Sequence, residues 1–406
     1  MPGLSDYVII GGGLAGGWAA SSIRKVDRTG KIVLVANENH IPYDRVPLSK
    51  DYLIDKIPKD KLFFKKEEFY EKNEIELIPD HEAKELDTKA RTLKLDDDRE
   101  LTFGKLLLAT GGYPRKIPIN GSDLKGVYYL RTLEDCEQLK DVISHSRRAV
   151  IIGGGFIGCE LAAAFATKGL ETTIVEMGPY LMNMAIDEET GRWIGSYYSE
   201  KGVSVLLNAT ASRFFGENGR VSGVELKDGR TIPADFIVVG VGIALHTELA
   251  ERAGLKVDKG IVVNEYLETS VEGIYAAGDV ARFYSPLFKR HLRLEHYDIA
   301  VKHGMIAGAN MAGVRKPFDE LPYFFSYQFD LKINAYGDLS QRTKIVKRGA
   351  LNKDSGFLQF YLNQGTLDAV LSVNKGGDEV KKAKELVFAR KSFSDPTVLS
   401  NESVQL

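Results

Sequence analysis

The sequence predicts an α/β protein in which one pattern of strand, glycine loop and helix occurs twice and a smaller α+β domain follows. An apolar run ending at Ile10 enters the loop GGGLAG, residues 11–16, and then a stretch of small residues with helical character. A second apolar run ending at Ile152 enters GGGFIG, residues 153–158, and a similar stretch. From about Leu321 the chain becomes richer in aromatic residues and in alternating strand patterns. We therefore expect two domains of one design and a third of another design.

The length and composition of the chain limit the classes of protein to consider. With 406 residues the chain exceeds the roughly 250–300 residues at which a single core stops growing. No apolar run approaches the roughly 18 residues that span a bilayer, and no secretory signal is evident at the start, so we expect a cytoplasmic protein. The formal charge of −2 gives no general attraction to nucleic acid. Neither a monomer nor a homodimer is excluded.

Both glycine loops have the spacing Gly-x-Gly-x-x-Gly between a strand and a helix, which is typical of dinucleotide binding. The first glycine permits a tight turn, the second lets a pyrophosphate approach the backbone, and the third lets the helix pack on the strand. The helix N-terminus then binds the phosphates. These positions are Gly11, Gly13 and Gly16 in the first loop and Gly153, Gly155 and Gly158 in the second. The pair of loops predicts two Rossmann-like domains.

An acidic residue follows the second strand of each unit, where a ribose hydroxyl is usually bound. In the first unit Asn37 and Glu38 follow the strand, and we favour Glu38, which stands 22 residues beyond the last loop glycine. In the second unit Glu176 stands 18 residues beyond the last loop glycine, with no arginine or lysine in the next several positions. Because a carboxylate repels the 2′-phosphate of NADPH, we expect NADH as the donor.

Later segments also repeat, since KLLLATGG (105–112) and DFIVVGVG (235–242) each predict a buried strand that ends in glycine. Residues 121–131 and the helix-like residues 132–144 are interpreted as a crossover into the second domain. The expected domains are 1–112 with 236–320, then 113–235, and finally 321–406.

Two further segments carry a family resemblance, PYDRVPLSK (42–50) and TSVEGIYAAGDV (269–280). With the glycine loops they resemble the two-dinucleotide-binding flavoproteins, over at least residues 7–337. The first segment resembles a branch that holds reductase components of bacterial oxygenases, putidaredoxin and rubredoxin reductases, monodehydroascorbate reductase and apoptosis-inducing factor. The resemblance implies FAD in the first domain, NADH in the second, and hydride transfer from NADH to flavin N5 before electrons pass to a separate acceptor.

The same resemblance implies roles for individual residues. Lys50 and Glu160 resemble a Lys–Glu pair near flavin N5 that orients the ring and tunes the flavin, although a salt bridge joining two domains is an alternative. His296 at a helix start is either a contact of the ring or a structural hydrogen-bonding residue. Phe325 stands where the branch often has tryptophan, and it either stacks near the flavin or packs in the third domain. The other residues assigned to the cofactors are Arg45, Ala109, Thr110, Gly111, Gly242, Gly278, Asp279 and Glu295.

Cysteine and histidine placement argues against thiol and metal chemistry. Cys136 and Cys159 are the two cysteines of the chain, they form no Cys-x-x-Cys motif, and the segment around Lys50 lacks a cysteine. Disulfide reductases, coenzyme A disulfide reductases and water-forming NADH oxidases of the superfamily need a thiol there, so these activities are disfavoured. The histidines show no ligand spacing, and we expect no metal site.

The electron acceptor is left open between several classes. Our first hypothesis is a ferredoxin- or rubredoxin-type protein, usually small and acidic, which basic residues near the flavin motifs would attract. These residues are Arg282, Lys289, Arg290 and Arg293, and an ordinary solvated loop explains them equally well. The alternatives are a small acceptor such as monodehydroascorbate, a quinone or oxygen, and a redox-signalling role like that of apoptosis-inducing factor.

Overall fold

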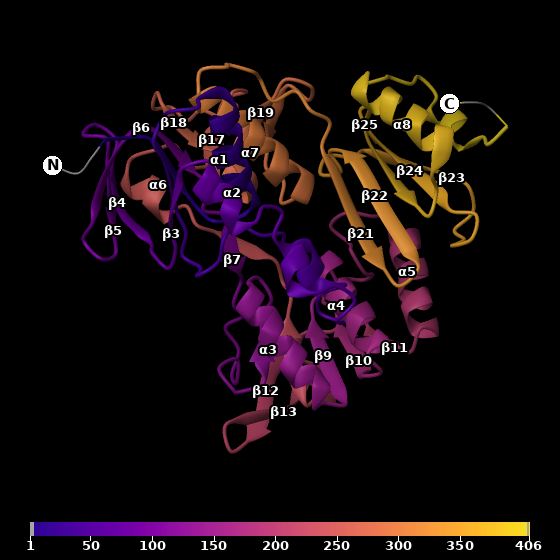
Figure 1. The fold of residues 1–406 in the computed structure, drawn as a ribbon. Coiled ribbons are helices and arrows are strands. Elements are labelled where there is room, and N and C mark those ends of the chain that lie inside the picture. Colours follow the sequence, from indigo (N-terminus) through magenta and orange to yellow (C-terminus); the bar gives the residue numbers. More distant parts are fainter. Residues whose placement is uncertain (1–3, 404–405) are drawn as a thin grey trace. The chain divides into compact units, whose positions relative to one another are not determined.

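The computed structural model of the chain describes residues 4–403 and residue 406, which form two compact units (Figure 1). Unit 1 comprises the residues up to 44 together with 59–113 and 244–323, and unit 2 comprises 45–58, 114–243 and 324–406. Within the described part of the chain, no helix has the length and apolar character needed to cross a bilayer.

Unit 1 is built on a parallel sheet with the strand order β3-β2-β1-β6, and β18 pairs with the other edge of β6. Strand β2 is wholly buried, as expected for a parallel sheet covered on both faces. The bounds of these strands are β1 (Leu4–Ile10), β2 (Ile32–Val35), β3 (Ile75–Ile78), β6 (Glu100–Leu108) and β18 (Ile274–Ala276). The strand that enters the first glycine loop is therefore central in its sheet.

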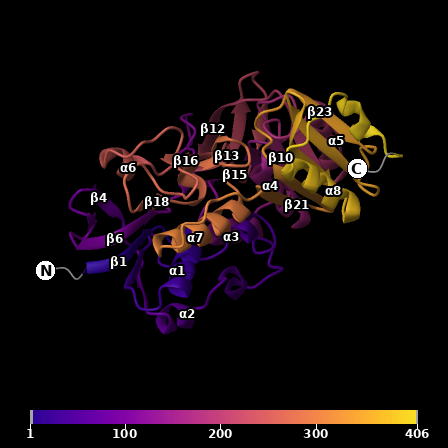
Figure 2. The same ribbon diagram turned by 90° about the horizontal axis from the view of Figure 1, so that it is seen from above.

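Helices α1 (Leu14–Val26) and α7 (Tyr297–Met311) lie side by side in unit 1, as Figures 1 and 2 both show. Two glycines of α7 make this close approach possible. A Cβ atom on Gly304 would lie 2.3 Å from the Ala15 carbonyl oxygen, and one on Gly308 would lie 2.4 Å from that of Ala19. The small residues noted after the first glycine loop therefore serve close packing of the two helices.

Smaller elements complete unit 1. Strands β4 and β5 extend the main sheet in antiparallel fashion, and β17, β19 and β20 form a separate three-stranded sheet. Their bounds, with those of the short helices, are β4 (Ala83–Asp87), β5 (Thr92–Leu95), β17 (Ile261–Val263), β19 (Ala281–Ser285), β20 (Arg290–Leu292), α2 (Glu67–Lys72), α6 (Glu248–Arg252), η2 (Lys59–Leu62) and η3 (Gly278–Val280). Strands β7 (Gly112–Pro114) and β16 (Ile243–Leu245) lie where the chain passes from one unit to the other.

Unit 2 repeats the parallel architecture with the strand order β11-β10-β9-β15-β8. Here too the strand that enters the glycine loop is central and is followed by a helix. The bounds are β8 (Val127–Tyr128), β9 (Arg148–Ile152), β10 (Glu171–Val175), β11 (Val203–Leu206), β15 (Phe236–Val239), α3 (Leu133–Ser144), α4 (Phe156–Thr167), α5 (Glu188–Glu200) and the antiparallel β12 (Ala211–Glu217), β13 (Arg220–Leu226) and β14 (Thr231–Pro233). The expectation of two Rossmann-like sheets is confirmed.

Helix α3 begins with a capping box, which explains why the sequence pattern predicted its start correctly. Thr132 accepts a hydrogen bond from the backbone of Asp135, whose carboxylate in turn accepts one from the backbone of Thr132. This capping box satisfies N–H groups that the helix start would otherwise leave unpaired. The helix begins within one residue of the expected start at position 132.

The structure groups some segments differently from the expected ranges. Residues 121–131, expected as a crossover, contain β8, which completes the second sheet, and its two residues are too few to show periodicity. Strand β15 pairs with β9 and so belongs to unit 2, whereas we had placed residues from 236 onward in the first domain. Residues 45–58 also belong to unit 2, because the short helix η1 (Val46–Ser49) packs against α3 and α4.

The C-terminal part of unit 2 is an antiparallel sheet with the strand order β21-β22-β25-β24-β23, against which α8 packs. The bounds are β21 (Tyr323–Gln328), β22 (Leu331–Gly337), β23 (Lys344–Arg348), β24 (Phe357–Asn363), β25 (Thr366–Val373), α8 (Gly377–Phe388) and η4 (Pro396–Ser400). The strands expected at 357–362 and 369–373 lie within β24 and β25. The expected α+β character of this region is confirmed.

Candidate functional site

Protein contacts in the first loop require glycine at the two outer positions. Gly11 has φ +115°, in the region that favours glycine, and a Cβ atom there would lie 2.1 Å from the Ala109 carbonyl oxygen. A Cβ atom on Gly16 would lie 2.0 Å from the Gly11 carbonyl oxygen. The tight turn and the close approach of α1 to its strand therefore account for both glycines.

The second loop has the same geometry. Gly153 has φ +111°, and a Cβ atom there would lie 2.4 Å from the Gly240 carbonyl oxygen. A Cβ atom on Gly158 would lie 2.0 Å from the carbonyl oxygen of Gly153. Two loops in different sheets thus satisfy the same backbone requirements.

The middle glycines, Gly13 and Gly155, are not explained by protein contacts. Each has an extended backbone that other residues adopt, and apart from the adjoining residues and the helix's own backbone, no atom of the described chain lies within 4 Å of a Cβ atom placed there. Each is the N-cap of its helix, yet neither helix has a side-chain cap or an acidic residue in its first turn. Open space thus faces two helix N-termini whose N–H groups and dipoles favour an anion. The site fits a pyrophosphate at each loop.

Glu38 lies three residues beyond the end of β2 in unit 1 and is half-buried, whereas Asn37 is exposed. The hydroxyl of Tyr43 donates a hydrogen bond of 2.6 Å to a Glu38 carboxylate oxygen and holds the side chain in place. A carboxylate fixed in this way at the end of the second strand is suited to accept hydrogen bonds from ribose hydroxyls.

Glu176 lies beside the second glycine loop. One of its carboxylate oxygens accepts a 2.6 Å hydrogen bond from the backbone N–H of Gly154, and the other accepts one of 2.6 Å from that of Gly178. The side chain of Asn183 donates a further bond of 3.1 Å to the second oxygen. The sequence did not reveal Asn183, which stands seven residues beyond the acid. The residue after the acid, Met177, is 74% exposed and carries no charge that would attract a 2′-phosphate.

Lys50 and Glu160 meet in unit 2. The Lys50 Nζ atom lies 2.8 Å from a Glu160 carboxylate oxygen, and the Glu160 side chain is only 3% exposed. The same oxygen accepts a 2.5 Å hydrogen bond from the Ser49 hydroxyl, and the other oxygen accepts one from the Ser326 hydroxyl. The carboxylate therefore has three donors in a buried setting, two of which, Ser49 and Ser326, sequence reasoning did not single out. Each serine stands next to a residue predicted for the site, Ser49 before Lys50 and Ser326 after Phe325.

Phe325 of β21 lies close to this ion pair. The Lys50 ammonium lies 5.9 Å from the centre of the Phe325 ring, a distance compatible with a cation–π contact. The ring also packs at a tilt against Tyr327, with 5.3 Å between the ring centres. The half-buried Phe325 therefore borders the Lys50–Glu160 pair in addition to packing within its own strand.

A buried histidine holds the segment that contains Gly278 and Asp279 in unit 1. The Nδ1 atom of His303 accepts a 3.3 Å hydrogen bond from the backbone N–H of Gly278. Burial lowers the pKa of His303 to about 3, so the imidazole is neutral and its Nδ1 can accept. The Phe283 and Phe318 rings pack against it in T-shaped arrangements, with ring centres 4.6 and 4.5 Å from that of the imidazole. His303 was not expected from sequence, because a lone histidine within an apolar helix gives no pattern.

The remaining predicted residues also fall into the two units. In unit 1, Thr110 donates a 2.7 Å hydrogen bond to the His246 carbonyl oxygen, and Gly111 has φ +61°. His296 is the N-cap of α7, and the exposed Glu295 pairs with Arg293. Unit 1 thus contains Gly11, Gly13, Gly16, Asn37, Glu38, Ala109, Thr110, Gly111, Gly278, Asp279, Glu295 and His296. Unit 2 contains Arg45, Lys50, Gly153, Gly155, Gly158, Glu160, Glu176, Gly242 and Phe325.

Within unit 2, Arg45 donates a 2.9 Å hydrogen bond to the Arg131 carbonyl oxygen, which ties the start of η1 to the segment before α3. Gly242 has φ +94°, which favours glycine at that turn.

Both cysteine thiols are buried and unreactive in character. The Cys136 thiol contacts the Leu48 carbonyl oxygen at 3.3 Å, and burial raises its pKa to about 12. Burial also raises the pKa of Cys159. Because the thiolate is the reactive form, neither residue is suited to relay electrons.

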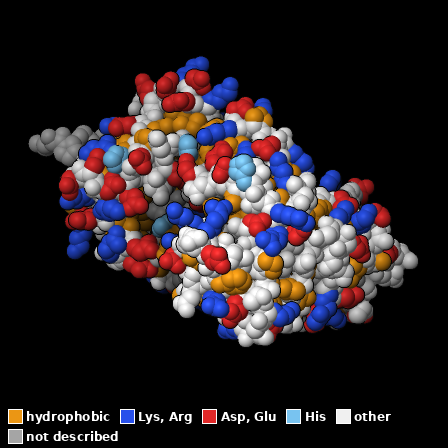
Figure 3. Space-filling view, turned by 90° about the horizontal axis from the view of Figure 1, so that it is seen from below, with side chains coloured by type: hydrophobic (Ala, Val, Ile, Leu, Met, Phe, Trp, Pro, Cys, Tyr) orange, Lys and Arg blue, Asp and Glu red, His pale blue; other side chains and the backbone are white. Residues whose placement is uncertain are grey.

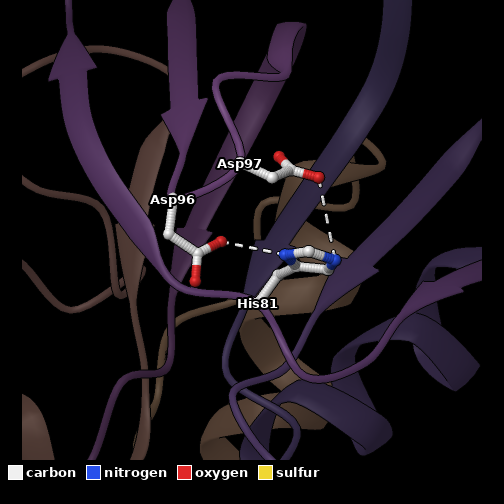
Figure 4. A group of neighbouring side chains, drawn as sticks. All are labelled: His81, Asp96 and Asp97. Atoms are coloured by element: carbon white, nitrogen blue, oxygen red, sulfur yellow. Dashed lines mark hydrogen bonds and ion pairs between the residues drawn. The ribbon is translucent and has the colours of Figure 1, made fainter.

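His81, Asp96 and Asp97 form a cluster at the edge of unit 1, where the loop after β3 meets the turn between β5 and β6 (Figure 4). The two ring nitrogens of His81 lie 2.9 Å from Asp96 and 3.8 Å from Asp97. The hydrogen bond from His81 lowers the pKa of Asp96. Sequence spacing did not predict this cluster, and its members already pair with one another, so we assign no ion to it.

The basic residues considered for docking are partly neutralised. Arg282 pairs with Asp258 and Arg293 pairs with Glu295, whereas Lys289 is exposed at the turn between β19 and β20. On the face of the molecule in Figure 3, acidic and basic side chains are interspersed. A single strong positive patch is therefore not evident on that face.

Comparisons with known proteins cover nearly the whole chain. The family model described as pyridine nucleotide-disulphide oxidoreductase matches residues 5–304, and the model described as reductase C-terminal matches residues 323–406. Rhodocoxin reductase of Rhodococcus erythropolis is 36% identical over 94% of this chain and 89% of its own length. The chain is also similar to a solved ferredoxin reductase of Rhodopseudomonas palustris, with a TM-score of 0.92, 35% identity and 98% of each chain covered. A covalent putidaredoxin reductase–putidaredoxin complex gives a TM-score of 0.93 at 32% identity, over 98% of this chain and 96% of that chain.

Proposed function

Because the chain belongs to the pyridine nucleotide-disulphide oxidoreductase family, in its ferredoxin and rubredoxin reductase branch, we propose that it oxidises NADH through bound FAD and reduces a small iron–sulfur protein or rubredoxin. The observation that carries this proposal is that the similarity to ferredoxin reductases spans 98% of the chain, including the C-terminal sheet. We also propose that the protein works in the cytoplasm, where NADH is available.

In the proposal, unit 1 binds FAD and the parallel sheet of unit 2 binds NAD(H). Three features of unit 1 support FAD binding: the open space before Gly13, the fixed carboxylate of Glu38, and Asp279 on a segment anchored by His303. In unit 2, the open space before Gly155 and the carboxylate of Glu176 support NADH binding. The backbone N–H groups at each helix start would bind a pyrophosphate.

When bound, FAD would accept a hydride from NADH and release the electrons in separate steps, while the protein binds and orients the reactants. Glu176 would accept hydrogen bonds from ribose hydroxyls and repel a 2′-phosphate. If the pair acts as the family resemblance implies, Lys50 and Glu160 would fix the position of one positive charge near the flavin ring. These residues hold and orient groups, and none of them needs to transfer a proton.

The state of the thiols supports a one-electron protein acceptor over disulfide chemistry. Cys136 and Cys159 are both buried, and burial raises the pKa of each. Electrons would therefore leave the flavin directly. An acidic acceptor would be attracted to local positive charge such as that of Lys289, and the attraction would weaken with salt.

The proposal is tested by an anaerobic titration of the purified flavoprotein with NADH and, separately, with NADPH, followed by the flavin spectrum. Oxidised ferredoxin, rubredoxin, a quinone or air is then added to the reduced protein. Rapid bleaching by NADH and rapid reoxidation by ferredoxin or rubredoxin are expected. If only the quinone or air reoxidises the reduced flavin rapidly, the proposal of a protein acceptor is wrong. A long-lived long-wavelength complex with poor turnover of every acceptor would favour a signalling role instead.

A further inference from the structure

A line of buried hydrogen bonds connects the C-terminal sheet to Glu160. Ser326 and Gln328, both on β21, point to the same side of that strand because side chains alternate. Gln328 Nε2 lies 3.0 Å from the Ser326 hydroxyl, which contacts the Glu160 oxygen that Lys50 does not bind. The Tyr198 hydroxyl lies 2.9 Å from Gln328 Oε1 and also 2.9 Å from the carbonyl oxygen of Cys159.

The charge of Glu160 sets the directions of the hydrogen bonds that Ser326 and Gln328 make in this line. A carboxylate accepts only, so Ser326 must donate its single hydroxyl hydrogen to Glu160. The Ser326 oxygen is then left to accept, which requires the NH₂ side of Gln328 to face it and Oε1 to face Tyr198. The other Gln328 hydrogen faces the Met182 sulfur at 3.8 Å. The hydrogen-bond donors of Ser326 and Gln328 that lie in this line therefore point toward Glu160, whereas the single Tyr198 hydrogen has two acceptors, Gln328 Oε1 and the Cys159 carbonyl oxygen.

This arrangement is more elaborate than stability requires. Ser326 is 1% exposed, and Gln328 and Tyr198 are 0% exposed, so each polar group has lost its water. Apolar side chains of similar volume would fill the same space without that desolvation. Burial raises the pKa of Tyr198 well above its usual value, so it remains a neutral phenol that can donate. The line holds one carboxylate oxygen in place and leaves the other for Ser49 and Lys50.

We propose that Ser326 and Gln328 are positioning residues for hydride transfer, acting through Glu160 to fix the Lys50 ammonium. This inference rests on the proposed function and deepens it, since it gives the C-terminal sheet a part in flavin reduction. Neither residue is expected to touch a cofactor. The effect should therefore appear in the rate of reduction more than in the affinity for NADH.

The test compares Ser326→Ala with Ser372→Ala in the FAD-loaded protein. Ser372 is a suitable control because it is also buried in the C-terminal sheet and donates one hydrogen bond, to the Lys375 carbonyl oxygen. Loss of one charge-assisted hydrogen bond should slow flavin reduction by about tenfold in Ser326→Ala, measured by anaerobic stopped flow, with less than about a twofold change in the NADH dissociation constant. Ser372→Ala should leave both quantities unchanged.

A double-mutant cycle separates positioning from a structural effect. If Ser326 acts through Glu160 and Lys50, then adding Ser326→Ala to Lys50→Met should slow reduction by less than about twofold beyond Lys50→Met alone. Independent effects would instead multiply and would overturn the proposal. A second cycle combines Ser326→Ala with Glu160→Gln and measures the thermal unfolding midpoints of the apoprotein variants. The two substitutions should show non-additive effects on this midpoint, a readout that does not depend on activity. Absence of that coupling would also count against the proposal.

The variant Gln328→Glu provides a readout that a packing role would not produce. When ionised, the new carboxylate accepts only, so it competes with Glu160 for the Ser326 hydrogen. Because burial can raise a glutamate pKa to about 8–9, the reduction rate of this variant should fall as pH rises from about 6 to about 9, and the native protein should not show this fall. A pH profile identical to the native profile would overturn the inferred direction of the line.

The two proposals fail in different ways. If native protein is not reduced by NADH, both proposals are wrong. If native protein is reduced rapidly and Lys50→Met is slow, while Ser326→Ala behaves like Ser372→Ala, only the positioning role of Ser326 is wrong.

Discussion

The ammonium of Lys50 lies 2.8 Å from a carboxylate oxygen of Glu160, and both residues belong to the same compact unit. A buried ion pair is weak evidence for a purely stabilising role, because desolvation of two charges opposes their attraction. The family resemblance relates this pair to the flavin ring, and the geometry agrees with a charge whose position is fixed. The pair is therefore the best place to test function by mutation.

Lys50→Met should slow flavin reduction by about a hundredfold while the dissociation constant of NADH changes by less than about threefold. The reason is that a charge near the reacting rings affects the rate, whereas the pyrophosphate and ribose contacts are kept. Stopped-flow reduction over a range of NADH concentrations separates the two quantities. Lys168→Met, which removes a more exposed ion pair with Asp55 in the same unit, is the matched control and should be unchanged. Equal rates in the two variants would reject a role in reduction.

Gly13→Val should remove FAD without unfolding the protein. A Cβ atom at position 13 lies more than 4 Å from the rest of the described chain outside the adjoining residues and the helix backbone, so the Val side chain would extend into the open space before the start of α1. We expect at least about a tenfold loss of bound FAD and only about 1 kcal/mol of stability lost at the helix cap. In contrast, Gly11→Val should destabilise the fold itself, because a Cβ atom there lies 2.1 Å from the Ala109 carbonyl oxygen. Flavin content and apoprotein melting distinguish the two, and full flavin occupancy in Gly13→Val would refute the assignment.

Glu176→Arg should reduce the preference for NADH over NADPH by at least about tenfold. The substitution removes the carboxylate beside the second glycine loop and supplies a positive charge for a 2′-phosphate. The ratio of kcat/KM for the two nucleotides measures this preference. Glu200→Arg, with the same change of charge at an exposed position at the end of α5, should leave the ratio unaltered. An unchanged ratio in Glu176→Arg would exclude a role for this residue at the ribose.

His303 should make stability depend on pH below neutrality. Its pKa is lowered from 6.5 to about 3 by burial, so below pH 6.5 the unfolded chain binds a proton that the folded chain does not bind until about pH 3. The contribution of His303 to the free energy of unfolding is therefore complete above pH 6.5. The free energy of unfolding falls as pH decreases from 6.5 toward 3, by about 2 kcal/mol between pH 7 and pH 5.

His303→Asn, which retains an acceptor near the Gly278 N–H group, should remove this part of the pH dependence, measured by urea unfolding at the two pH values. His145→Asn alters an exposed histidine at the end of α3 and should retain the native dependence. A pH dependence in His303→Asn equal to the native one would show that other groups are responsible.

Local sequence patterns predicted the parts of the fold that depend on neighbouring residues. The strands before both glycine loops, the helices after them, and β24 and β25 were expected close to where they lie, since periodicity and glycine placement act over a few residues. Strand β8 was missed because two residues carry no period, and the association of residues 45–58 with α3 and α4 was missed because it depends on contacts far apart in sequence.

The same division holds for the candidate site. The sequence by itself determined the two glycine loops and predicted the acids Glu38 and Glu176 from their spacing after the loops, whereas Lys50 and Glu160 were related to each other only through the family resemblance. Only the tertiary structure decided that Ser326, 166 residues from Glu160, donates to that carboxylate and that Asn183 donates to Glu176. Such contacts arise when separate elements pack against one another and every buried polar group must find a partner, a requirement that spacing along the chain does not record.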